Sequence, residues 1–453
     1  MAVDSHDLKA LFEQGLRLHH AGRLAEALEA YSRFALLNDG HPDIYNNMGV
    51  ALRALGHYHA AVACYERALT LKPGGSGTWS NMGNALRELG RFDEALVAHN
   101  RTLSQDGPSP SLMHNIGIVY RDLGRMEEAL AWFERGIAIE PDHVNCQWDR
   151  ALALLMLGDY GRGFRDYEWR WKTDKARSRR LGDKLWQGQN LEGRTLLLTT
   201  EQGFGDAIQW MRFIPQAAAR GARVIVETQP ELERLFACVD GVDGLIPAGT
   251  LPGHYDAQLP LLSLSGTLGV TLETLPRQVP YLRLPPIPEA QILPPVRPGQ
   301  KRVGLVWAGK LRPRDRSCPL PLLAPLFGHV QARFFSLQMG ERRDDIQKFG
   351  FAGLISDLGQ QIQDFVDMAQ WMRQMDLIIT IDSGPAHLAG ALGVPTWNLL
   401  LYAADWRWML NRSDSPWYPH MRLFRQIRHE DWTEPTQALQ AAFRTWMQGG
   451  PLL

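Results

Sequence analysis

Small and apolar residues recur every 34 positions through the first third of the chain, in three columns that keep one spacing. One column is glycine, the second is alanine, and the third holds large rings with one histidine among them. The members are Gly15, Gly49, Gly83 and Gly117; Ala27, Ala61, Ala95 and Ala129; and Tyr31, Tyr65, His99 and Phe133. Small residues let two helices approach while the ring fills the space beside them, so the period predicts a stack of helix pairs.

This repeat resembles the tetratricopeptide repeat, and we expect about five copies over residues 1–176. The fifth, less regular copy has Gly158 in its turn and is expected to cap the stack. One polar column is not explained by packing, and its members are Asn47, Asn81, Asn115 and Asp149. An amide both donates and accepts a hydrogen bond, which suits the backbone of an extended peptide.

The polar column resembles the asparagine ladder of O-GlcNAc transferase, whose tetratricopeptide groove holds protein substrates. We therefore predict that these four side chains line a groove for an acceptor peptide. The alternative is that they bond neighbouring repeats to one another.

The remaining two thirds of the chain alternates apolar strands with helical segments. Residues 194–228 follow the pattern of strand, glycine loop, helix and strand, which is typical of a parallel sheet. The proline-rich residues 284–300 predict a linker before a second series of strands. The expected fold class is therefore α plus α/β: an all-α solenoid, then two Rossmann-like domains at 190–285 and 300–425 that resemble the GT-B glycosyltransferase fold. A C-terminal helix within 426–453 is expected to pack back on the first of these domains.

The stretch IDSGPAHLAGALGVPTW joins a buried strand to a helix through an acid and a tight turn. Leu377 to Ile381 form an apolar run typical of a strand buried on both faces. Pro385 suits the first turn of a helix, and Gly393 suits its end. A helix N-terminus attracts anions, and ligands of α/β sheets bind at the carboxyl ends of strands. The alternative is an ordinary capped helix that binds nothing.

Three motifs resemble the ADP-heptose:lipopolysaccharide heptosyltransferase group, glycosyltransferase family nine: EQGFGDAIQ, GLVWAGKLRPRDRSCPLPLLAPL and IDSGPAHLAGALGVPTW. The resemblance covers about residues 194 to 425. It implies that Asp206, in a glycine loop with Gly203 and Gly205, is the general base of an inverting transfer. Glu201 in the same loop is the reserve base. The alternative for Asp206 is a cap of the helix that follows.

The same resemblance implies that the second domain binds a nucleotide-sugar. A basic loop would neutralise the leaving phosphate, Asp382 would hold sugar hydroxyls, and the amides of residues 383–387 would lie near phosphate or ribose. The predicted donor-binding residues are Lys310, Arg312, Arg314, Arg316, Gln338, Asp382, Ser383, Gly384 and His387. A single lysine is typical of the group, so the cation that acts here stays open. For His387 the alternative is a structural contact with a neighbouring element.

Charge and composition narrow the choice of partners. The net charge of −1 gives no sign of a nucleic-acid or membrane partner. The four scattered cysteines form no CxxC pair, and no His/Glu cluster has metal-ligand spacing. The resemblance to the GT-B fold implies a transfer that needs no metal, so we predict no metal and no cofactor, with the nucleotide-sugar as co-substrate. No secretory signal and no apolar run near the roughly 20 residues that span a bilayer are present, so a cytoplasmic location is expected.

Together these features predict a glycosyltransferase whose repeats present a protein acceptor. The arrangement resembles bacterial flagellin glycosyltransferases, which add nonulosonic acids from CMP donors. The alternatives are a heptosyltransferase-like enzyme that acts on a glycan or lipopolysaccharide, and a non-catalytic repeat scaffold with a degenerate GT-B half. The tryptophan-rich residues 405–426 are expected to pack where the chain crosses back to the first domain, rather than to stack on a base or sugar.

Overall fold

The computed structural model describes residues 5–173, 184–201, 203–250, 253–310 and 315–453. The chain divides into two compact units, Met1–Ala153 and Leu154–Leu453, which are described separately. The first unit is entirely helical, and the second contains two parallel sheets. The predicted fold class, a helical solenoid followed by two Rossmann-like α/β domains, is confirmed.

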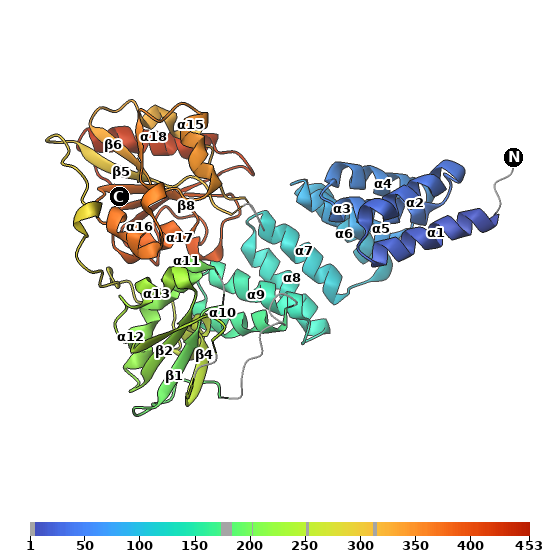
Figure 1. Ribbon diagram of the computed structural model, residues 1–453. Helices are drawn as coiled ribbons and strands as arrows, with labels where there is room; N and C mark the ends of the chain where they lie inside the picture. Colours follow the sequence, from blue (N-terminus) through green and yellow to red (C-terminus); the bar gives the residue numbers. More distant parts are fainter. Residues whose placement is uncertain (1–4, 174–183, 202, 251–252, 311–314) are drawn as a thin grey trace. The chain divides into compact units, whose positions relative to one another are not determined.

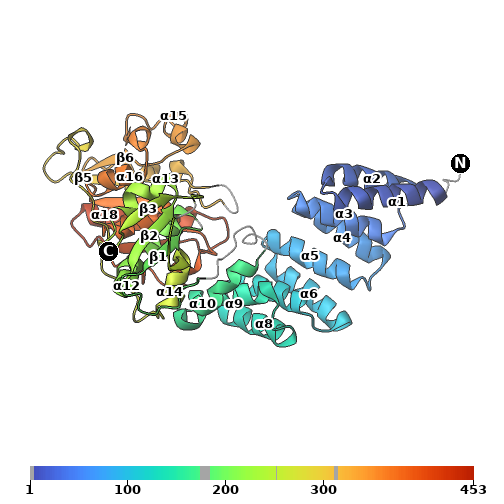
Figure 2. The ribbon, with the colours of Figure 1, turned by 60° about the horizontal axis from the view of Figure 1, so that its bottom comes forward.

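The first unit is a stack of helix pairs, seen in Figures 1 and 2 as successive hairpins. Its helices are α1 (Ser5–His20), α2 (Leu24–Leu37), α3 (Pro42–Ala54), α4 (Tyr58–Leu71), α5 (Ser76–Glu88), α6 (Phe92–Asp106), α7 (Pro110–Asp122), α8 (Met126–Ile139) and most of α9 (Val144–Met156), whose last turn runs past Ala153. The glycine column is required by the ring column. A Cβ on Gly49 would lie 2.4 Å from the Tyr65 ring, and a Cβ on Gly117 would lie 2.4 Å from the Phe133 ring.

The first sheet of the second unit has four parallel strands in the order β3-β2-β1-β4. The strands are β1 (Thr195–Thr199), β2 (Arg223–Thr228), β3 (Gly244–Pro247) and β4 (Ala257–Pro260). The helices of this half are α11 (Phe204–Trp210), α12 (Ile214–Ala218), α13 (Pro230–Phe236) and α14 (Leu264–Thr267), with the 3-10 turns η2 (Met211–Phe213) and η3 (Leu261–Ser263). Helix α11 begins directly after β1, so its first turn lies at the carboxyl end of that strand.

The second sheet has six parallel strands in the order β10-β9-β8-β5-β6-β7. The strands are β5 (Lys301–Leu305), β6 (Ala332–Ser336), β7 (Ile355–Asp357), β8 (Leu377–Ile381), β9 (Thr396–Leu400) and β10 (Met421–Arg425). Its helices are α15 (Asp345–Lys348), α16 (Phe365–Met372), α17 (Gly384–Ala391) and α18 (Thr433–Met447), with η5 (Leu320–Leu326) and η8 (Trp406–Trp408). Every residue of β8 and β9 is buried, because helices cover both faces of the sheet (Figure 1).

The C-terminal helix corrects one prediction. We expected residues 426–453 to pack back on the first domain, but α18 packs on the second sheet. Phe443 and Trp446 of α18 contact the ring of Trp397 on β9, with ring centroids 6.2 and 6.3 Å apart. The apolar side of α18 thus packs on its own sheet. The prediction that this helix packs back on the first domain was wrong.

The tryptophan-rich segment is the part that crosses back, as predicted. Trp417 lies 5.7 Å from the Trp210 ring of α11 and 6.4 Å from Phe213, and its indole donates to the Tyr160 hydroxyl at 2.9 Å. Tyr160 and Phe164 belong to α10 (Tyr160–Asp166), which we expected within the repeat region 1–176. Because their rings complete this aromatic cluster, α10 belongs to the second unit, and the first unit ends at Ala153.

The proline-rich linker is held on the surface of α16. The Gln370 amide and the Arg373 guanidinium both donate to the Pro285 carbonyl, at 3.1 and 3.0 Å. The Gln374 side chain accepts from the Leu293 amide at 2.9 Å and donates to the Gln291 carbonyl at 2.9 Å. The linker is therefore a fixed part of the second unit.

Candidate active site

Asp206 lies in the first turn of α11, at the carboxyl end of β1. Its Oδ2 accepts a hydrogen bond from the Gly203 amide at 3.1 Å, and Gly203 is the N-cap residue of the helix. Its Oδ1 accepts a hydrogen bond from Nη2 of Arg407 at 2.6 Å. Burial raises the pKa of Asp206, and the Arg407 cation opposes that rise. Capping therefore uses one oxygen of Asp206, while 22% of the side chain stays exposed.

The glycine loop brings the two halves of the second unit together. Helices α11 and α17 contact each other side by side (Figure 1). A Cβ on Gly205 would lie 2.8 Å from Cδ2 of His387 and 3.3 Å from Cα of Gly384. Glycine is therefore needed at 205 because α17 approaches its backbone.

Asp382 lies at the carboxyl end of β8, directly before α17. Its side chain is 6% exposed, and its Oδ2 is 3.2 Å from Nη1 of Arg316. Burial raises the pKa of Asp382, and Arg316 opposes the rise. Ser383, not Asp382, occupies the N-cap position of α17, and its hydroxyl donates to the Ile381 carbonyl at 3.1 Å. Asp382 is therefore a buried acid paired with the partly exposed Arg316, and it does not cap the helix.

His387 is enclosed within the fold. Its Nδ1 is joined to the Tyr418 hydroxyl by a hydrogen bond of 2.9 Å, and its ring stacks on Trp408 with centroids 5.3 Å apart. Burial lowers the pKa of His387 well below its ordinary value, and Arg407, Arg212 and Arg316 lower it further. The imidazole is therefore neutral at ordinary pH. Its contacts with Tyr418 and Trp408 support the alternative that His387 makes a structural contact with a neighbouring element.

The basic loop is only partly described. Lys310 is exposed, with Nζ 5.8 Å from the centre of the Phe204 ring in the glycine loop. Arg316 reaches Asp382, as stated above. Arg312 and Arg314, also predicted to bind the donor, lie outside the described residues. The structure thus brings Lys310 and Arg316 to the two motifs that carry Asp206 and Asp382.

Two further predicted residues each make three or four hydrogen bonds within the fold. The Gln338 side chain accepts from the Trp307 and Ala308 amides at 3.1 and 2.9 Å, and it donates to the Ala308 and Met339 carbonyls. It ties the end of β5 to the end of β6. The Glu201 carboxylate accepts two hydrogen bonds from Arg170, at 2.9 and 3.0 Å, and one from the Leu262 amide at 3.2 Å. Asp206 is therefore the more accessible carboxylate of the loop.

The polar column of the repeats divides into two kinds. The Asn81 side chain donates to Asn46 of the preceding repeat at 3.1 Å. Asp149 accepts from His114 at 2.6 Å and from Arg121 at 2.7 Å. Those two members bond neighbouring repeats, which was the alternative to peptide binding.

The other two members are differently placed. Asn47 has one long contact of 3.5 Å with its neighbour Asn46, and no described residue hydrogen-bonds the half-buried Asn115 side chain. Among the described residues, the side chains of Asn47 and Asn115 are thus less engaged than those of Asn81 and Asp149, and peptide binding by them stays a prediction.

Both the repeat region and the C-terminal α/β region match known protein families. Residues 42–74 and 76–139 match the tetratricopeptide repeat, and residues 363–428 match glycosyltransferase family 9 (heptosyltransferase). The chain joins tetratricopeptide repeats to a glycosyltransferase family 9 domain. The matched part of that domain contains Asp382, His387 and Arg407 but not Asp206.

One curated relative is similar to much of this chain. Over 326 residues the chain is 29% identical to Protein FlbA of Caulobacter vibrioides, covering 64% of this chain and 53% of FlbA. The chain therefore spans about half the length of the curated relative it matches. Among solved structures, MamA residues 41 to the end from Desulfovibrio magneticus RS-1 has a TM-score of 0.33 and 17% identity, covering 39% of this chain and 98% of MamA. PilF of Pseudomonas aeruginosa has a TM-score of 0.33 and 17% identity, covering 36% and 75%.

The family 9 domain contains an arginine that the sequence analysis missed. Arg407 lies in η8, inside the tryptophan-rich segment that was interpreted as packing. Its side chain is 6% exposed and pairs with both Asp405 and Asp206, at 2.8 and 2.6 Å. A charged Asp-Trp-Arg sequence among buried rings was the available signal, because a charge can only be buried there with a partner.

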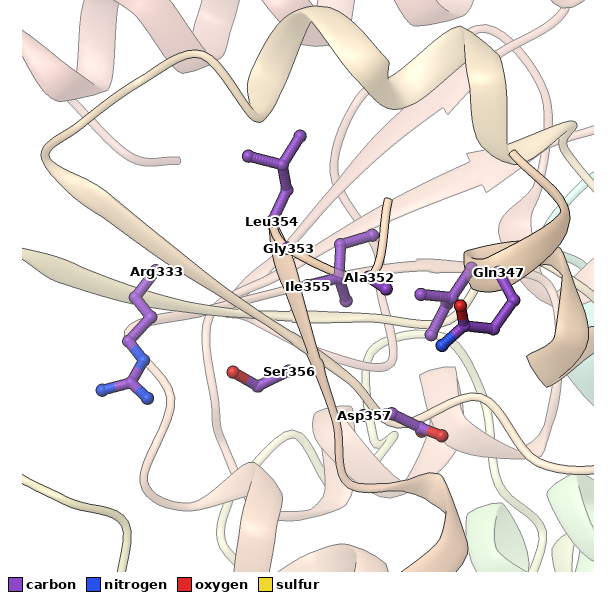
Figure 3. Close-up of a pocket in the computed structure, with 9 residues that line it drawn as sticks. Arg333, Gln347, Ala352, Gly353, Leu354, Ile355, Ser356 and Asp357 are labelled. Atoms are coloured by element: carbon purple, nitrogen blue, oxygen red, sulfur yellow. The ribbon is translucent and has the colours of Figure 1, made fainter. Parts of the chain in front are cut away.

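A cavity of about 410 Å³ lies at β7, the edge strand of the second sheet (Figure 3). It is lined by Arg333, by Ile346 and Gln347, and by residues 352–357. Asp357 already pairs with Arg343 at 3.1 Å, and Arg333 lies on the other side of the segment in Figure 3. None of the predicted site residues lines this cavity, so it is separate from the candidate active site.

Two searches of the described residues bear on metals and membranes. No group of three His, Cys, Asp or Glu side chains in that part of the chain is arranged to hold a metal ion. Within the same residues, no helix has the length and apolar character needed to cross a membrane. Metal independence and a cytoplasmic location stay predictions.

Proposed function

We propose that this protein is a glycosyltransferase that moves a sugar from a nucleotide-sugar to a protein acceptor. The observation that carries the proposal is the contact between the two motif-bearing helices, where Gly205 lies against Gly384 and His387. That contact brings the Asp206 loop of one Rossmann-like half to the Asp382 turn of the other. A glycosyl transfer needs both, because the base must meet the donor sugar at one place.

The donor side is formed by the family 9 domain. The first turn of α17 offers backbone N–H groups and the positive end of a helix of eight residues, which suit a phosphate. Lys310 and Arg316 supply cations on the neighbouring loop, where negative charge develops as the phosphate leaves. Asp382 is the acceptor for donor-sugar hydroxyls, and binding of the donor would draw Arg316 from Asp382 towards phosphate.

The reaction we propose is an inverting displacement. Asp206 takes the proton of the acceptor hydroxyl as that oxygen forms a bond to the anomeric carbon. The bond from the anomeric carbon to the leaving phosphate oxygen breaks, and the electron pair leaves with the nucleotide. Arg407 cannot take this proton because an arginine stays protonated in proteins.

The acceptor side is assigned to the repeats. Tetratricopeptide arrays bind partners along extended surfaces, and Asn47 and Asn115 retain amide groups for a peptide backbone. Flagellin is the acceptor to test first, with a nonulosonic acid donated from a CMP-sugar, because the arrangement resembles the flagellin glycosyltransferases.

A second candidate is transfer to a glycan. It is favoured by the match to family 9, whose description names heptosyltransferases. A glycan acceptor would leave the repeat groove without a role in the reaction. A third candidate, a non-catalytic scaffold, predicts binding of a partner without turnover of any donor.

The test uses the full chain and a panel of CMP-, ADP-, UDP- and GDP-sugars. A donor present at about 100 times its Kd should stabilise the folded protein by about 2.7 kcal/mol, which a melting curve detects. Transfer is then measured to flagellin and, in parallel, to a lipopolysaccharide core oligosaccharide, each with and without a chelator. Transfer to flagellin that survives the chelator supports the proposal. Transfer to the oligosaccharide alone favours the glycan candidate, and binding of no donor overturns both.

A further inference from the structure

Arg407 is a buried cation. It belongs to the second Rossmann-like half of the α/β unit, but its hydrogen-bond partners include residues of the first half. It lies in η8, after β9, yet its Nη2 donates to Asp206 at 2.6 Å and its Nε donates to Gln209 at 2.6 Å. Both partners belong to α11, about 200 positions earlier in the chain. Its Nη1 donates to Asp405 at 2.8 Å. All three nitrogens of the guanidinium are therefore engaged, and two of them fix one helix.

Aromatic rings hold the guanidinium in place. The centroids of the Trp406 and Trp210 rings lie 4.5 and 5.2 Å from the guanidinium carbon. Cations over aromatic faces are attracted by the ring, and the attraction grows when water is excluded. Since the Arg407 side chain is only 6% exposed, it has little freedom to move. A fixed donor of this kind restricts the carboxylate it binds.

Asp206 is restricted without being blocked. Each carboxylate oxygen accepts one hydrogen bond, from Arg407 and from the Gly203 amide. An ionised carboxylate offers about four lone-pair sites, so about two remain. The Asp206 side chain is 22% exposed, whereas the Arg407 side chain is only 6% exposed. A ligand can therefore reach the acid but not the cation behind it.

We propose that Arg407 is a positioning residue, which orients the Asp206 carboxylate and keeps it ionised for proton transfer. The inference rests on the proposed function, because it takes Asp206 to be the base. It goes beyond that function by adding a residue of the opposite half to the machinery. An arginine suits the task because its planar fork binds in a fixed geometry, whereas a lysine supplies a movable point charge.

Several charged groups surround Asp206 and determine how it titrates. Burial and the nearby Asp405 raise its pKa, while Arg407, the Gly203 amide and Arg316 lower it. Tyr167 of η1 (Tyr167–Lys172) also lies close enough that the Asp206 charge raises the pKa of its hydroxyl. Asp382 and His387 lie on the facing turn. Removing the Arg407 charge should therefore raise the pKa of Asp206 and move the acidic limb of the rate profile to higher pH.

The test is a double-mutant cycle in the full chain, with the donor that the panel identifies as substrate. Misplacing a reacting group by about 1 Å can cost about 100-fold in rate, so we expect about that loss for Arg407→Gln. Arg407→Lys should recover part of it. If Arg407 acts through Asp206, adding Arg407→Gln to Asp206→Asn should slow the enzyme little further. Losses that multiply in the double variant would overturn the inference.

A second measurement keeps the inference testable whatever the donor. The Asp206 carboxyl is followed by carbon-13 NMR of protein labelled on aspartate side chains, with Asp206→Asn identifying its signal. The signal should titrate at higher pH in Arg407→Gln. The matched control is Arg412→Gln, because Arg412 lies in the same segment, is more exposed than Arg407 (26% against 6%) and pairs with Asp414 at 2.6 Å. This control should leave both the titration and the rate unchanged.

The outcomes separate the inference from the proposed function. An active wild type whose Asp206 titrates alike with and without Arg407 overturns the inference alone. A wild type that turns over no nucleotide-sugar overturns the proposed function, and with it the role of Arg407 in catalysis. Loss of folding in Arg407→Gln is checked by its melting curve, and Arg407→Lys then carries the comparison.

Discussion

The polar side chains of the repeat unit and of the α/β unit bond to partners at very different separations along the chain. In the repeats, Asn81 bonds to Asn46 and Asp149 bonds to His114, and each pair is 35 positions apart. In the α/β unit, Arg407 reaches Asp206 across 201 positions, and the Trp417 indole reaches Tyr160 across 257. Contacts of the first kind recur with the sequence period, while those of the second kind exist only after both halves have folded.

This difference shows where each unit is vulnerable. A change in one repeat disturbs its neighbours, because each repeat contacts only the next one along the stack. A change at the junction of the two sheets disturbs the candidate site, because α11, α17 and η8 all meet there. The following predictions separate these two kinds of damage.

The largest effect is expected for Asp206→Asn. The substitution keeps the shape of the side chain and removes its basicity, so transfer should fall by about 100- to 10,000-fold. Donor binding, measured by calorimetric titration, should stay nearly unchanged, as should the melting temperature. Transfer at the wild-type rate would show that Asp206 is not the base.

The next largest effect is expected for Phe164→Ala, which tests the boundary between the units. Removing a buried phenylalanine costs about 3–5 kcal/mol of unfolding free energy. Phe164 packs against Trp417 and Trp406, so hydrogen exchange should accelerate within residues 154–453. The matched control, Phe133→Ala, should accelerate exchange within residues 1–153 instead. Equal effects of both variants on the first unit would place α10 with the repeats after all.

His99→Phe should change how stability depends on pH. His99 is fully buried, and neither ring nitrogen has a hydrogen-bond partner among the described residues. Burial lowers its pKa from 6.5 to about 4, so the unfolded chain binds the proton more readily. Stability present above about pH 6.5 is therefore lost as the pH falls toward 4, at about 1.4 kcal/mol per pH unit.

That loss should be absent from His99→Phe, which restores the ring found at Phe133. Urea unfolding of both proteins from pH 4 to 8 provides the check, and their difference should approach about 3 kcal/mol at pH 4. A difference independent of pH would mean that His99 is not neutral in the folded repeat.

Asp382→Ala should weaken donor binding about 10- to 150-fold, because a hydrogen bond to a charged group contributes about 1.5–3 kcal/mol. Calorimetric titration of the donor measures this directly. Because Asp382 pairs with Arg316, the melting temperature should also fall, so Asp382→Asn is the matched variant that keeps the shape. Unchanged donor affinity in both variants would place the donor site elsewhere.

The smallest effect is expected for Asn81→Ala in the repeats. It removes one hydrogen bond to Asn46, which contributes about 0.5–1.5 kcal/mol to stability. Asn115→Ala removes no such bond, so it should leave stability unchanged and weaken binding of a protein acceptor. Loss of acceptor binding in Asn81→Ala alone would reverse the two roles.

The sequence by itself determined the repeat unit almost completely. The period of 34 reports contacts between neighbours in the chain, so the pairing of Gly49 with Tyr65 could be predicted without coordinates. The two sheets followed from the apolar runs and the turns between them. The strand end at Asp382 and the glycine loop at Asp206 were likewise found as local patterns.

Tertiary structure alone decided which of those residues meet and what each is free to do. Glu201 and Gln338 looked suitable for chemistry, but buried backbone and arginine partners occupy their polar atoms. Arg407 looked like part of an aromatic packing segment, and the fold placed it on Asp206. A local pattern reports propensity and burial, whereas a contact across 201 positions depends on how the sheets come together, and no single stretch of sequence records that.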